Sequence, residues 1–247
     1  GCRSTLTLLD GVVERAGAAP PASVWPCRGR CPFPARHETP RDCAACLAHE
    51  VTEGTLHCEA CGRRYPVQAG VPRLLAGDPR EGARPVGRTA NSYGYLWGRS
   101  RVEARDGDSR PYHFEVMARA LGLTPPSGLV LDAGCGEGLD LIRQGSRTGV
   151  EIVGVELSDG GCRKSFRRTR HQPTTHVVQA DLCRLPFPND LFDFVYSYGV
   201  LHHLDLEKAY RELARILRDD GVVLCVAALR HNPLIHLYRK MTPHVRS

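Results

Sequence analysis

Carboxylates end three apolar runs of this sequence, at spacings that would bring them together around one ligand. Asp132 follows the run at 129–131, Glu156 the run at 152–155, and Asp181 the run at 175–180. Such runs are typical of buried strands, and the carboxyl ends of parallel strands meet at one edge of a sheet. Acids gathered there suit a ligand that offers hydrogen-bond donors or positive charge, and Asp132 would repel a pyrophosphate.

Glycine occupies every second position after Asp132. Gly134, Gly136 and Gly138 predict a tight turn that opens a helix, because glycine reaches unusual backbone angles and lets the main chain approach a ligand. Glycine spacing alone is weak evidence, since dinucleotide-binding folds share it. A nicotinamide-binding fingerprint, however, usually has an apolar residue where Asp132 stands. The acids could instead cap helix N-termini, but three of them beside a glycine turn favour a binding site.

Alternating strands and helices must position these residues. Strands are predicted at 129–131, 152–156, 175–181, 192–197 and 222–227, and apolar residues at helical spacing predict a helix over 206–217, with Gly221 just after its end. This alternation is typical of an α/β fold with a doubly wound, mostly parallel sheet covered by helices on both faces. Right-handed crossovers then fix most of the topology.

Four successive segments resemble the motifs of class I S-adenosylmethionine-dependent methyltransferases of the type 11-like group. They read LDAGCGEG, VGVELS, QADLCRLPF and FDFVYSYGVLHHL, and they occur in the family's order and spacing. The resemblance implies a Rossmann-like fold and S-adenosylmethionine as cofactor. It assigns Asp132, Gly134 and Gly136 to the amino-acid end of the cofactor, Glu156 to the ribose, Leu157, Asp181 and Leu182 to the adenine, and Ser197 to the region beneath the sulfonium.

The methyl acceptor is less well defined than the cofactor. Residues 197–200 depart from the Asn/Asp-Pro-Pro-Tyr sequence of amino-directed enzymes, which favours a small-molecule acceptor such as a quinone, lipid, sugar or natural-product intermediate. His202 and His203 are the nearest candidates for a catalytic base, the alternative being a helix-start or packing role. The basic run at 163–170 indicates either a patch for RNA or acidic substrates or a solvated helix face.

Two C-x-x-C pairs near the N-terminus predict a structural zinc site. Cys43, Cys46, Cys58 and Cys61 can supply the four thiolates of a closed tetrahedral site. The segment resembles the zinc ribbon that precedes some bacterial methyltransferase domains, and also the small activator subunit of several RNA and protein methyltransferases. RNA base methylation is therefore an alternative function. Cys27 and Cys31 form either a second half-site or unliganded thiols.

The organisation follows from these modules. We expect a poorly ordered proline-rich lead-in over 1–40, a zinc ribbon over 41–76, a linker over 77–90 and a methyltransferase domain over 91–247. The family's sheet has seven strands, and the last two have no counterpart here, so we expect a truncated domain, a partner chain that completes the sheet, or a catalytically silent regulatory or scaffold protein.

Composition sets the outer limits. The chain has 247 residues, 42% of them hydrophobic and 24% charged, and a net charge of +6, which is ordinary for a globular protein. The sequence contains no apolar run of about 18 residues, so no membrane-spanning helix is predicted. Single cysteines scattered through the second half favour a reduced, cytoplasmic protein.

Overall fold

The structure is a computed structural model that describes residues 6–15, 49–75, 95, 121–122, 127–147 and 149–226. Several predictions lie outside these ranges, namely those for Cys27, Cys31, Cys43 and Cys46, for the linker at 77–90, and for the missing strands after residue 226. Among the described residues, no helix has the length and apolar character needed to cross a membrane.

A five-stranded sheet forms the larger part of the fold, and its strands are all parallel. Their order is β7-β6-β5-β8-β9, so the chain starts in the middle of the sheet, builds outward to β7, and crosses back to β8. The strands are β5 (Gly128–Ala133), β6 (Val150–Glu156), β7 (Thr175–Gln179), β8 (Phe192–Tyr198) and β9 (Leu217–Val226). This confirms the predicted doubly wound sheet.

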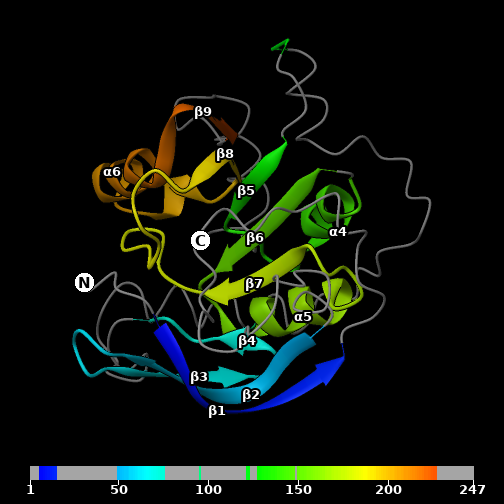
Figure 1. Ribbon diagram of the computed structural model, residues 1–247. Coiled ribbons are helices and arrows are strands. Elements are labelled where there is room, and N and C mark those ends of the chain that lie inside the picture. Colours follow the sequence, from blue (N-terminus) through cyan, green and yellow to red (C-terminus); the bar gives the residue numbers. More distant parts are fainter. Residues whose placement is uncertain are drawn as a thin grey trace.

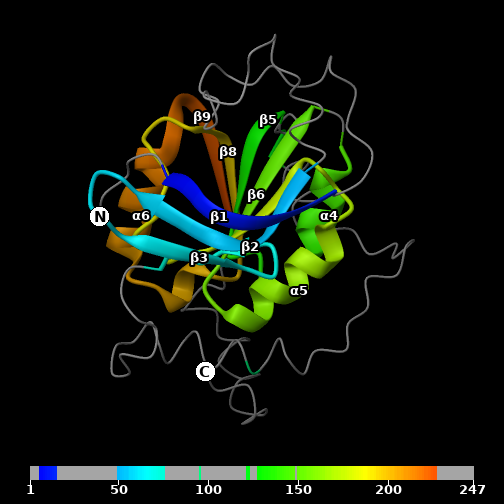
Figure 2. The same ribbon diagram turned by 60° about the horizontal axis from the view of Figure 1, so that its bottom comes forward.

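Helices cover both faces of the sheet, and each follows from its own sequence. Figure 2 shows α4 (Leu139–Gly145) and α5 (Asp159–Thr169) on one side and α6 (Leu206–Ile216) on the other. Ser158 caps α5 by accepting a hydrogen bond from the Gly161 N–H, and Asp205 caps α6 by accepting one from Lys208. The short 3-10 helix η2 (Leu201–His203) connects β8 to α6.

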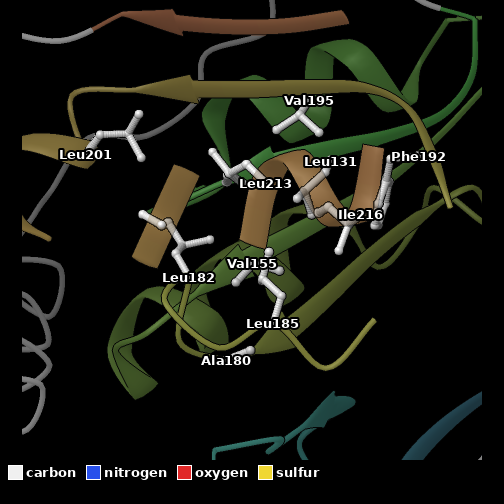
Figure 3. Close-up of a cluster of buried hydrophobic side chains, with 12 residues drawn as sticks. Leu131, Val155, Ala180, Leu182, Leu185, Phe192, Val195, Leu201, Leu213 and Ile216 are labelled. Atoms are coloured by element: carbon white, nitrogen blue, oxygen red, sulfur yellow. The ribbon is translucent and has the colours of Figure 1, made fainter. Parts of the chain in front are cut away.

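Two apolar clusters fill the space between the layers. The cluster under α6 joins Leu213 and Ile216 of the helix to Leu131, Phe192 and Val195 of the strands (Figure 3). The cluster on the opposite face includes Val130, Ile152, Val177, Leu141 of α4 and Cys162 of α5. Because both faces of the strands are buried, the strands carry continuous apolar runs.

The helix before the last strand differs from the prediction. We expected α6 to extend to Leu217 and to end just before Gly221, but the helix ends at Ile216 and β9 begins at Leu217. Phe192 pairs with Leu217 whereas Phe194 pairs with Val222, so residues 218–221 form a bulge within the strand. Gly221 therefore marks a bulge in β9 and not the end of the helix.

A second, antiparallel sheet precedes the larger one and has the order β1-β2-β3-β4. Its strands are β1 (Leu6–Arg15), β2 (His49–Cys58), β3 (Arg64–Gln68) and β4 (Val71–Pro72). Tyr65, Pro66 and Val67 lie in β3, which pairs antiparallel with β2. Figure 1 shows this sheet beside β7 and α5.

The expected lead-in over 1–40 is wrong for its first part. Leu6–Arg15 forms β1 and pairs with β2 along its whole length, from Leu6 opposite Cys58 to Arg15 opposite His49. The prolines that suggested irregular structure begin at residue 20, whereas Leu6–Arg15 contains none and is rich in leucine and valine. The N-terminal sheet therefore begins well before residue 41.

Candidate cofactor site

The predicted site residues gather where four neighbouring strands end. Asp132 is the second-to-last residue of β5, Glu156 is the last residue of β6, and Asp181 follows β7. Ser197 lies near the end of β8, on the other side of β5. Since these strands are parallel neighbours, their carboxyl ends form one edge, which is where open α/β sheets bind ligands.

The glycine turn after β5 requires glycine at positions that the sequence indicated. Gly134, Gly136 and Gly138 all have positive φ angles, of 92°, 54° and 78°. A Cβ at Gly134 would lie 2.4 Å from a methyl carbon of Val200, and one at Gly138 would lie 2.9 Å from Ser165. The turn is thus enclosed between the segment that leads into η2 and helix α5.

Asp132 is a buried carboxylate beside other acids. Burial raises its pKa well above the ordinary value, and the nearby Asp140 and Glu156 raise it further. Within the described ranges, no side chain or N–H group donates a hydrogen bond to it. A carboxylate of this kind is stabilised by a cationic ligand, and the ammonium group of an amino acid has the required charge.

Glu156 already binds the turn that follows it. One carboxylate oxygen accepts hydrogen bonds from the Ser158 N–H at 2.8 Å and the Ser158 hydroxyl at 2.6 Å, and the other accepts one from the Gly136 N–H at 3.2 Å. A carboxylate has about four acceptor positions, so these three bonds leave capacity for a ribose hydroxyl. Glu156 therefore links the glycine turn to the start of α5.

The residues predicted for the adenine lie at the adjacent strand. Asp181 is half-buried and accepts a hydrogen bond from the Cys183 N–H at 2.9 Å, which fixes the turn after β7. The Leu182 side chain is buried in the cluster under α6, so only its backbone can serve a ligand. Leu157 is half-buried, and its carbonyl accepts a hydrogen bond from the Gln179 side chain at 2.9 Å.

Ser197 and the two histidines follow on the far side of β5. The buried Ser197 hydroxyl donates to the Ala133 carbonyl at 2.9 Å, which ties β8 to the beginning of the glycine turn. His202 and His203 lie in η2 with ring centroids 3.9 Å apart. Their segment reaches the site through Val200, whose side chain packs against Gly134.

Helix α5 binds the glycine turn through Lys164, Ser165 and Arg168, for which the sequence predicted no individual role in the site. The Ser165 hydroxyl donates to the Gly136 carbonyl at 2.8 Å, and Arg168 donates to the Glu137 carbonyl at 2.7 Å. The buried Glu137 carboxylate pairs with Lys164 at 2.6 Å and with Arg168 at 3.1 Å. Two cations of the basic run at 163–170 therefore serve the fold, and do not form a free basic patch.

Half of the predicted zinc ligands are described. Cys58 is buried at the end of β2, and Cys61 is exposed three residues later. The Gly62 N–H donates to the Cys58 carbonyl at 2.8 Å, and the Cys58 N–H donates to the Arg63 carbonyl at 2.9 Å, so residues 58–63 make a tight turn. This turn suits a knuckle of two thiolates. The described ranges contain no cluster of three or more metal-ligating side chains, and Cys43 and Cys46 lie outside them.

Comparison with known families supports the interpretation of the larger sheet. Residues 131–225 match the family model of a methyltransferase domain, and this match contains the glycine turn, the three strand-end acids and η2. This part of the chain therefore has the sequence of a methyltransferase domain on a parallel, doubly wound sheet. Residues 2–70 match the model of Trm112p-like proteins, a match that spans β1, β2 and β3.

Curated relatives share the methyltransferase domain over part of their length. A sterol 24-C-methyltransferase of Aspergillus fumigatus is 30% identical over 141 residues, which are 53% of this chain and 37% of that protein. A malonyl-acyl-carrier-protein O-methyltransferase of Enterobacter lignolyticus is 37% identical over 95 residues, or 38% of this chain and 36% of that protein. The chain thus spans about a third of the length of the curated relatives that it matches.

A solved structure similar to this chain is the complex of the Haloferax volcanii Trm112 methyltransferase activator with a methyltransferase. The sequence identity is 25%, the TM-score is 0.46, and the match covers 52% of this chain and 59% of that one.

Proposed function

We propose that the protein transfers a methyl group from S-adenosylmethionine to a small-molecule acceptor. The observation that carries this proposal is the buried Asp132 carboxylate, which lies beside the glycine turn and has no donor among the described residues. Asp132 would hold the ammonium group of the cofactor, Glu156 its ribose hydroxyls, and Asp181 the adenine amino group. The cofactor supplies an activated methyl group, so the chain's own residues have mainly to orient the acceptor and exclude water.

Residues 197–200 and the relatives favour a small-molecule acceptor. The segment lacks the paired prolines that present carbonyl groups to a planar amino group. Among the relatives are enzymes named for a sterol and for demethylmenaquinone, and another is named for a malonyl group on an acyl carrier protein. We extend the small-molecule class of the first two to the present chain. If the acceptor is a hydroxyl or an acidic carbon, His202 or His203 would accept its proton.

RNA is the second candidate acceptor. It is favoured by the match of residues 2–70 to Trm112p-like proteins and by the resemblance of this segment to the activator subunit of RNA and protein methyltransferases. The ion pairs of Lys164 and Arg168 with Glu137 count against it, because they use part of the positive charge on α5.

Calorimetric titration with S-adenosylmethionine tests the cofactor assignment. We expect binding by the wild-type protein and a loss of affinity of about 10-fold or more in Asp132→Ala and in Glu156→Ala, because hydrogen bonds to charged groups contribute about 1.5–3 kcal/mol. Absence of binding by folded wild-type protein would support a catalytically silent role. Unchanged affinity in both variants would refute the site.

Transfer of a labelled methyl group then identifies the acceptor. The protein is incubated with methyl-labelled S-adenosylmethionine and either a lipid extract or total RNA of its source organism. Label in the organic-soluble fraction is the expected result. Label in RNA, with binding that weakens steeply as salt is added, would replace the small-molecule proposal with the RNA one.

A further inference from the structure

The two sheets meet at the edge strand β7, through the residues that follow β4. Arg73 forms a parallel bridge with Gln179, and the Leu74 N–H donates to the Gln179 carbonyl at 2.8 Å. The Arg73 N–H donates in the other direction, to the Pro66 carbonyl of β3 at 2.9 Å. Residue 73 therefore belongs to both sheets at once.

The side chain of Arg73 is buried at this junction and points toward the start of α5. It is 8% exposed. Burying a guanidinium is costly unless its donors are used; both terminal nitrogens of Arg73 are used, whereas its Nε has no partner among the described residues. One terminal nitrogen pairs with the Asp159 carboxylate at 2.7 Å, and the other donates to the Gln179 side-chain oxygen at 3.2 Å. The amide nitrogen of Gln179 then donates to the Leu157 carbonyl at 2.9 Å.

These bonds fix the turn that carries predicted cofactor contacts. Arg73 holds Leu157 indirectly, through Gln179, and holds Asp159 directly through the ion pair. Ser158, which lies between these two residues, donates a hydrogen bond to the Glu156 carboxylate. The four residues from Glu156 to Asp159 are thus fixed from one side by Arg73 of the N-terminal module, by which we mean residues 6–15 and 49–75. They are fixed from the other side by the glycine turn, through the bond from the Gly136 N–H to Glu156.

Helix α5 provides a second connection between the N-terminal module and the site. A Cβ at Gly70 would lie only 2.0 Å from the ring of Phe166 in α5, so the turn before β4 packs directly on the helix. Val71 is fully buried in the same cluster as Cys162 of α5. On its other side α5 binds the glycine turn through Ser165 and Arg168.

We propose that Arg73 is a positioning residue for the cofactor, through which the N-terminal module sets the affinity of the methyltransferase domain for S-adenosylmethionine. This inference rests on the proposed function. Among the described residues, Arg73 makes no hydrogen bond or ion pair with the side chain of a predicted cofactor contact. It orders the Leu157–Asp159 turn through Asp159 and Gln179, so that Leu157 and Glu156 are held in place before the cofactor binds.

The test compares Arg73→Met with Arg163→Met by calorimetric titration with S-adenosylmethionine, well below the melting temperature. Methionine keeps most of the apolar stem of Arg73 and removes its charge. Arg163 pairs with the same Asp159 carboxylate at 2.7 Å but is exposed, and it bonds to none of the described residues of the N-terminal module. We expect Arg73→Met to weaken binding by about 10-fold and Arg163→Met to change it less than about twofold.

Arg73→Lys and Gln179→Leu complete the test. Lysine can reach Asp159 but cannot bind Gln179 in the same fork, so affinity should recover in part. Gln179→Leu leaves the ion pair intact and should weaken binding on its own, which keeps the test valid if Arg73→Met does not fold. If Arg73→Met and Gln179→Leu both lower the melting temperature but leave the cofactor affinity unchanged, the inference is overturned and the proposed function stands. Wild-type protein that binds no cofactor would instead overturn the proposed function, and the inference with it.

Discussion

At the scale of single residues, the candidate site places an acid where folding alone disfavours it. Asp132 is buried next to Asp140 and Glu156, and all of these raise its pKa above the ordinary value. Such a group costs stability in exchange for ligand binding, which is a common property of functional sites. The cost and the benefit are separable by mutation.

Replacing Asp132 by Asn should therefore stabilise the cofactor-free protein and weaken cofactor binding. The change removes a buried negative charge while keeping nearly the same shape. We expect an equal or higher melting temperature without cofactor, and loss of most of the rise that S-adenosylmethionine causes in the wild type. Thermal denaturation with and without cofactor measures both. A variant that is destabilised but still responds fully to cofactor would contradict this role.

The raised pKa of Asp132 also predicts how stability depends on pH. In the unfolded chain the pKa of this carboxyl is about 3.9, and in the folded protein its pKa is higher. Between these two pH values the folded state binds more protons than the unfolded state. The contribution of this group to the free energy of unfolding is therefore fully present below about pH 4 and is lost as pH rises through the folded pKa. Denaturant unfolding of the wild type across this range should show that decline, and Asp132→Asn should lack this part of it.

At the scale of elements, the glycine turn depends on contacts as well as on backbone angles. We compare Gly134→Ala with Gly149→Ala, since both glycines have positive φ angles, of 92° and 79°. Only Gly134 has a neighbour, Val200, where a Cβ would lie. Both variants should lose about 1–3 kcal/mol through backbone strain, and Gly134→Ala should lose more because of crowding. Equal losses in chemical denaturation would show that the contact with Val200 is unimportant.

The attachment of α5 to this turn is also measurable. Glu137→Gln breaks a largely buried pairing with Lys164 and Arg168, and we expect a loss of about 3 kcal/mol in the free energy of unfolding. The matched control is Glu207→Gln, which breaks a pair with Arg211 whose side chains are 79% and 72% exposed. That change should cost about 0.5 kcal/mol or less. Similar losses in the two variants would mean that Glu137 does not anchor the turn.

The sequence predicts these elements well where its patterns are local. The five strands of the larger sheet and helix α6 arise from apolar runs that can be recognised within ten residues or so. Predictions failed where pairing overrides local pattern: Gly221 looked like a helix end but lies in a bulge of β9, and β1 was missed because its strand character depends on β2.

At the scale of the whole molecule, the parts of the site that could not be predicted are contacts between distant segments. The strand-end acids were recognisable because each ends its own apolar run. Arg73 and Gln179 are separated by 106 positions, and Ser165 meets Gly136 across 29, so no spacing in the sequence announces either contact. Ser158 is an exception, because a serine before Asp159 is a recognisable helix cap.

Zinc binding tests the N-terminal module as a unit. Purified protein should contain about one zinc ion per chain, and Cys58→Ser should lose it together with the order of the N-terminal sheet, because a structural zinc site contributes folding free energy directly. Cys183→Ser is the control, since Cys183 lies in the methyltransferase domain. Metal content by mass spectrometry decides the matter. Wild-type protein without zinc, or Cys58→Ser that retains it, would refute the site.

The seam between Leu74 and β7 has a consequence for solubility. A sheet that ends in an unpaired strand offers its main-chain groups to strands of other molecules. Here Leu74 and Arg73 occupy the outer side of β7 at Gln179, and Val71 fills the apolar space beside it. A fragment that starts after residue 75 would present that border bare, and we expect it to self-associate into aggregates even if its cofactor site forms correctly.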